Sequence, residues 1–86
     1  MRRDPAEAAI LTLLRARAPD ATICPSEAAR TLAKARGAPE DWRAEMDRAH
    51  EAARRLADEG AVTLRQGGEV METPKGAYRI GRVGKS

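Results

Sequence analysis

The chain has 86 residues, which is enough for one small domain and too few for a repeat array or a large enzyme. Eighteen residues are Ala and none is Phe, so we expect a thin core closed by Ala-mediated contacts between helices. One Cys and one His exclude an internal disulfide and a structural zinc site, whereas a net charge of +3 keeps nucleic acid among the candidate partners.

The first predicted helix spans residues 5–18. Asp4 suits its N-cap, Pro5 suits the first helical position, and Pro19 stops the apolar periodicity. The next residues, 21–24, carry two β-branched side chains. They predict a short extended segment before the second helix.

Two further helices follow, over residues 25–36 and 40–59. Each has a Pro at or just before its first residue and at least one acidic residue in its first turn, and each is followed by a Gly that suits a helix C-terminus. Residues 40–59 have the clearest helical periodicity, because apolar side chains recur at intervals of three and four residues. These side chains predict a core-facing stripe consisting of Trp42, Met46, Ala49, Ala53 and Leu56.

After residue 60 the apolar periodicity changes to two, which predicts strands. Residues 61–66 and 77–82 are expected to form an antiparallel ribbon. Two connections fit the sequence: one long wing loop, or a tight hairpin at Gly67-Gly68 with a return strand over 69–72. We favour the long wing, since it keeps Tyr78 and Ile80 on the core.

The element order is helix, short strand, helix, helix and β-ribbon. This order predicts an α+β winged helix with residues 40–59 in the recognition-helix position. We expect one domain over residues 1–86, with residues 83–86 as a frayed tail.

Two short motifs, Cys24-Pro25-Ser26-Glu27 and Asp41-Trp42-Arg43, give the chain a family resemblance. Together with the Arg-rich last strand, they resemble a bacterial winged-helix family known only as a domain of unknown function. The resemblance extends over nearly the whole chain. It implies the winged-helix fold and implies no particular activity.

The distribution of charge argues against residues 40–59 as a reader of DNA. This segment contains four Arg and seven acidic residues, although the chain as a whole is basic. Residues 61–86 carry five basic and two acidic residues, so the wing is the better candidate for contacting phosphate. The charges of the third helix are expected to pair mostly with one another at i,i+4 spacing.

Seven basic residues are candidate DNA contacts, in decreasing order of preference from the wing to the second helix and then the third. They are Arg65, Lys75 and Arg79, then Arg30 and Lys34, then Arg43 and Arg48. Cys24 is interpreted as a small structural residue at a helix start, and His50 as a packed or half-exposed residue.

The first function hypothesis is a small DNA-binding regulator or accessory factor, and the alternative is a winged helix used for protein contact. We expect no catalytic activity, metal or cofactor, because the residues suggest no catalytic or ligand set. A lone thiol and the lack of an apolar run near about 20 residues predict a cytoplasmic protein without a membrane span. Because the sequence predicts no helix beyond the winged core to serve as a dimerisation arm, we expect a monomer or a weak homodimer.

Overall fold

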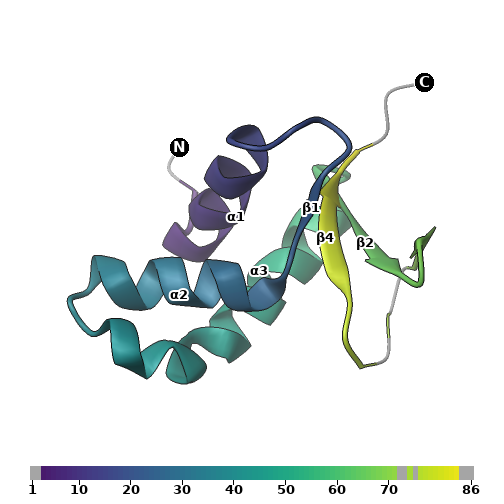
Figure 1. The fold of residues 1–86 in the computed structure, drawn as a ribbon. Coiled ribbons are helices and arrows are strands. Elements are labelled where there is room, and N and C mark those ends of the chain that lie inside the picture. Colours follow the sequence, from purple (N-terminus) through teal and green to yellow (C-terminus); the bar gives the residue numbers. More distant parts are fainter. Residues whose placement is uncertain (1–2, 72–73, 75, 84–86) are drawn as a thin grey trace.

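The structure, a computed structural model, describes residues 3–71, 74 and 76–83. Its helices are α1 (Pro5–Arg15), α2 (Pro25–Ala35) and α3 (Met46–Asp58), with a 3₁₀ helix η1 (Pro39–Glu45) before α3. Its strands are β1 (Thr22–Ile23), β2 (Val62–Gln66), β3 (Glu69–Val70) and β4 (Arg79–Arg82). The helices lie on one side of an antiparallel sheet with strand order β1-β4-β2-β3 (Figure 1). This is the predicted α+β winged-helix arrangement.

Local capping interactions fix where the first two helices begin. The Asp4 carboxylate accepts a hydrogen bond from the Ala6 amide (2.9 Å), as an N-cap residue should. At the start of α2, the Glu27 carboxylate accepts from the amide of Cys24, the N-cap residue (3.0 Å). The first helix is shorter than predicted, because the chain turns after Arg15 and residues 16–18 leave the helix.

The third predicted helix, 40–59, is not one continuous α-helix. Residues 39–45 form the tighter 3₁₀ helix η1, and Asp41 has non-helical backbone angles (φ −102°, ψ 27°). Arg36 stabilises this tighter segment, since it donates to the carboxylates of Asp41 (3.0 Å) and of the buried Glu45. The recognition-helix position therefore begins with a 3₁₀ helix, a form used in short pieces at helix termini.

The wing uses both connections that the sequence permits. Strands β2 and β3 form a hairpin around Gly67 and Gly68, both at positive φ, while β4 pairs with the other edge of β2. The short strand β1 then pairs with β4. The hairpin and the longer wing loop coexist because β2 offers hydrogen-bonding groups along both of its edges.

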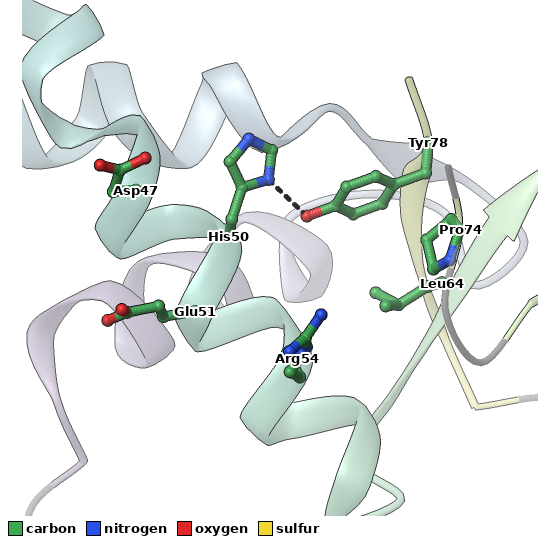
Figure 2. Close-up of a pocket in the computed structure, with 7 residues that line it drawn as sticks. All are labelled: Asp47, His50, Glu51, Arg54, Leu64, Pro74 and Tyr78. Carbon is green, nitrogen blue, oxygen red and sulfur yellow. Dashed lines mark hydrogen bonds between the residues drawn. The ribbon is translucent and has the colours of Figure 1, made fainter. Parts of the chain in front are cut away.

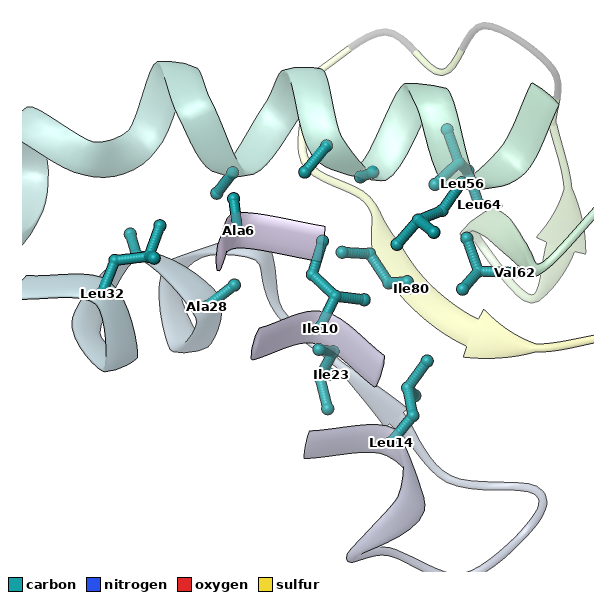
Figure 3. Close-up of a cluster of buried hydrophobic side chains, with 14 residues drawn as sticks. Ala6, Ile10, Leu14, Ile23, Ala28, Leu32, Leu56, Val62, Leu64 and Ile80 are labelled. Carbon is teal, nitrogen blue, oxygen red and sulfur yellow. The ribbon is translucent and has the colours of Figure 1, made fainter. Parts of the chain in front are cut away.

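The core lies between the sheet and the three helices (Figure 3). Six of the fourteen clustered residues are Ala, as the composition predicts, and the largest fully buried side chains are Ile10, Ile23, Leu56 and Ile80. Trp42 was predicted to lie in the core but is only partly buried and packs against its edge. The kink in η1 explains this position, because it changes the phase of the stripe before α3 begins.

Candidate nucleic-acid interface

The sheet has one face toward the helices and a second, outer face. Directly opposed residues of antiparallel strands lie on the same face, so the pairing register identifies the members of each. Arg65 is opposite both Arg79 and Val70, while Gly81 is opposite both Thr63 and Thr22. We call the resulting group the outer sheet face; it consists of Thr22, Thr63, Arg65, Val70, Arg79 and Gly81.

Arg79 is held against strand β1. Its Nε donates to the Thr22 hydroxyl (2.6 Å), and its Nη2 donates to the Thr22 carbonyl (3.0 Å). The side chain is nevertheless exposed and forms no ion pair within the part of the chain that the structure describes. The pKa of Glu27 is lowered mainly by a hydrogen bond from Arg17. The positive charge of Arg79 lowers this pKa further, by a smaller amount. Arg17 thus already occupies that carboxylate.

Arg65 is folded across the outer sheet face. Its Nε donates to the Thr63 hydroxyl (3.1 Å), and its Nη2 donates to the Arg82 carbonyl (3.3 Å). A Cβ built on Gly81 would lie 3.1 Å from Arg65 Nε and 3.2 Å from Thr22 Cγ2. Gly81 therefore leaves the space that the Arg65 guanidinium needs to lie flat on the sheet.

Other basic residues of the wing are placed differently. Arg82 belongs to the core-facing side and donates to the Leu14 carbonyl near the end of α1 (3.0 and 3.3 Å), where a cation favours the helix dipole. Lys75, a predicted phosphate contact, lies outside the described residues. Of the three preferred wing candidates, the structure brings Arg65 and Arg79 together.

The four helical candidates for DNA contact do not belong to the outer sheet face, and they differ in the residues that they contact. Arg30 and Arg43 each place a guanidinium carbon 4.4 Å from the ring centroid of Trp42. Arg48 pairs with Glu45 (3.1 Å), and Lys34 is exposed on α2. The prediction that Arg55 pairs with an acidic residue of its own helix is wrong. Its Nε lies 2.7 Å from the Glu7 carboxylate on α1.

A hollow of about 410 Å³ separates α3 from the wing (Figure 2). Asp47, Glu51 and Arg54 line its helical side, and Tyr78 lies opposite, with its hydroxyl 2.7 Å from His50 Nδ1. No basic group among the described residues pairs with Asp47 or Glu51. This hollow therefore presents two carboxylates that have no ion pair among the described residues.

A second hollow, of about 310 Å³, lies on the other side of the His50–Tyr78 contact and is lined partly by Cys24 and Met46. The pKa of the Cys24 thiol is lowered, chiefly because the Ser26 hydroxyl donates to the sulfur (3.3 Å). Burial raises the pKa of Tyr78 above its usual value. Cys24 thus takes part in the N-terminal turn of α2, at the edge of an apolar hollow.

Sequence reasoning missed three features of these surfaces. The hydroxyls of Thr22 and Thr63 hold the two outer arginines, and Trp42 is a platform for Arg30 and Arg43. The period-two alternation around Thr63 was a usable signal, because it places Thr63 and Arg65 on one face. The contacts that Thr22 and Trp42 make join segments distant in sequence. The spacing of residues along the chain therefore could not predict these contacts.

The fold and the outer sheet face define a small winged-helix domain with a basic, hydroxyl-bearing sheet surface. The chain belongs to the DUF3253 family, described as a protein of unknown function, whose model matches residues 3–83. No match is found among curated proteins. Across the described residues, none of the helices is long and apolar enough to traverse a bilayer, and no three potential ligands among Asp, Glu, His and Cys gather as a metal site.

Proposed function

We propose that this domain is a non-catalytic DNA-binding module that contacts the phosphate backbone through its outer sheet face. The observation that carries the proposal is the direct opposition of Arg65 and Arg79 on neighbouring strands. Like charges in opposed positions destabilise a sheet. Among the described residues no carboxylate belongs to this face, so an external anion is the natural partner that offsets the repulsion.

The hydrogen bonding of the two arginines supports the same role. A guanidinium has five N–H donors, and each of these side chains makes two hydrogen bonds to the described residues. The bonds restrict where each guanidinium lies, while donors remain for a phosphate oxygen. Such positioning reduces the entropy lost when the ligand binds.

The proposal assigns no base reading to α3. Asp47 and Glu51 line the groove beside this helix and would repel phosphate at the distance of a bound duplex. Phosphate contacts alone carry no sequence information, so we expect weak binding with little sequence preference. This is the behaviour of an accessory factor or of a regulator that gains specificity elsewhere.

The test is the salt dependence of duplex binding, measured by fluorescence anisotropy of a labelled duplex. Each lost phosphate contact reduces the slope of log K against log salt by about 0.9. Arg65→Gln together with Arg79→Gln should therefore flatten the slope by about 1.8. Arg48→Gln is the matched control, since Arg48 already pairs with Glu45. Equal slopes for the parent and the double variant would contradict the proposal.

Protein contact is the second candidate function, and the groove between α3 and the wing favours it. Asp47 and Glu51 are unpaired among the described residues and border a hollow large enough for a side chain. These charges suit a basic segment of a partner. The protein-contact function would replace the DNA proposal if the folded parent showed no duplex binding at low salt. It would also have to bind an Arg-rich peptide through Asp47 and Glu51.

A further inference from the structure

Trp42 is the centre of a second cationic feature, remote in sequence from the wing. Arg30 comes from α2 and Arg43 from η1, and both guanidinium carbons lie 4.4 Å from the centroid of its ring. We call these three residues the Arg–Trp–Arg cluster. Both arginines are exposed, whereas Trp42 is half-buried against the core. The ring is therefore anchored by the fold and contacts two exposed cations.

Most arginines outside the wing have a carboxylate partner, with Arg15 and Arg54 as exceptions among the described residues. Arg3, Arg17, Arg36, Arg48 and Arg55 each pair with at least one carboxylate. Over residues 3–71, 74 and 76–83, neither Arg30 nor Arg43 has such a pair.

Several acidic groups near the cluster are already engaged, although Asp47, four residues after Arg43, has no ion pair among the described residues. Arg36 holds both Asp41 and Glu45, and Arg17 holds Glu27, which leaves Glu40 as the acidic residue of η1 without an ion pair in the described chain. Lys34, one helical turn beyond Arg30, adds a further exposed cation. The surface around the cluster thus carries an excess of positive charge.

The chemistry of the guanidinium group suits an anion with paired oxygens, such as a phosphate. A guanidinium that interacts with an aromatic ring uses its face, so its N–H edge stays available for the paired oxygens of a phosphate. The same contacts occupy Trp42, so the ring cannot serve as a stacking platform for an unpaired base, the usual role of an aromatic residue in single-strand binding.

From these contacts we infer that the Arg–Trp–Arg cluster is a second phosphate-binding site, for the backbone of duplex DNA. The inference rests on the proposed DNA-binding function, because the same duplex supplies the phosphate. It adds the η1 and α2 surface to the outer sheet face. Arg43 then acts from the start of the recognition-helix position, while α3 itself contacts no phosphate.

Trp42 is the only Trp in the chain, so its fluorescence reports on this cluster alone. Short duplex DNA is titrated at low salt, with Trp emission and the anisotropy of labelled duplex followed in parallel. The emission should change with the same midpoint as the anisotropy. Arg30→Gln with Arg43→Gln should abolish the emission change and flatten the salt slope by about 1.8. Arg15→Gln, which removes an exposed charge elsewhere, should keep the emission change.

The outcomes separate this inference from the proposed function. If duplex binds without a change in Trp emission, and the double variant keeps the salt slope of the parent, the cluster is not a phosphate site. The proposal for the outer sheet face would be unaffected by that result. Absence of duplex binding by the parent would overturn both. Inorganic phosphate that shifts the emission as tightly as duplex would overturn the nucleic-acid assignment. Arg43→Lys provides a second variant: it keeps the charge and should weaken binding, because the planar stacked donor is lost.

Discussion

Replacing Trp42 with Ala tests how this residue contributes to the fold. A fully buried Trp replaced by Ala costs about 3–5 kcal/mol. Trp42 is only partly buried, which lowers that figure, but its two cation–π contacts add about 0.5–1 kcal/mol each. We therefore expect a loss of about 2–4 kcal/mol. The whole domain is expected to hold roughly 4–13 kcal/mol, so a domain near the middle of this range still folds after the loss.

Thermal and urea unfolding followed by circular dichroism measure this loss, and the Tm should fall by roughly 10–30 °C. A double-mutant cycle with Arg43→Gln then isolates one cation–π contact, with an expected coupling of about 0.5–1 kcal/mol. Arg15→Gln in the same cycle should show no coupling. Complete unfolding of Trp42→Ala would restore the core assignment made from the sequence, and an additive cycle with Arg43 would refute the stacking contact as an energetic interaction.

Three further predictions concern the core, the sheet and acid stability. Leu56→Ala should cost about 2–5 kcal/mol in urea unfolding, since Leu56 is fully buried; a smaller loss would place it outside the core. Gly81→Ala should cost about 1–3 kcal/mol, because the new methyl group crowds Arg65 and Thr22; an unchanged Tm would contradict this packing. The pKa of Glu7 is lowered, chiefly by the hydrogen bond from Arg55, so its stabilising contribution is present above its unfolded pKa of about 4.3 and is lost as pH falls through the folded pKa. Glu7→Gln should therefore flatten the acid side of a stability–pH curve, and a curve parallel to that of the parent would count against the ion pair.

Local signals predicted most of the fold. Pro at the starts of helices, Gly at their ends and the change of apolar period after Gly60 gave the element order and approximate bounds. The break at Asp41 was not predictable, because it depends on Arg36 reaching Asp41 and Glu45 across the turn. Tertiary contacts of this kind override local helix periodicity.

The candidate site was predictable only in part. Charge counting directed attention away from α3 and toward the strands, and alternation in β2 placed Arg65 on an outer face. The opposition of Arg65 and Arg79 depends on strand register, which the two competing wing connections left open. The position of Arg30 over Trp42 depends on the packing of α2 against η1, which joins residues distant in sequence.

The most direct test of the central claim is an NMR titration of the isotopically labelled domain with a short duplex at low salt. We predict that the largest shifts occur on the outer sheet face, at Thr22, Thr63, Arg65 and Arg79, with the side-chain Nε–H signals of the two arginines among them. The resonances of Asp47 and Glu51 should change little. Shifts concentrated at Asp47, Glu51 and Arg54, or no shifts at all, would contradict the assignment of DNA binding to this face.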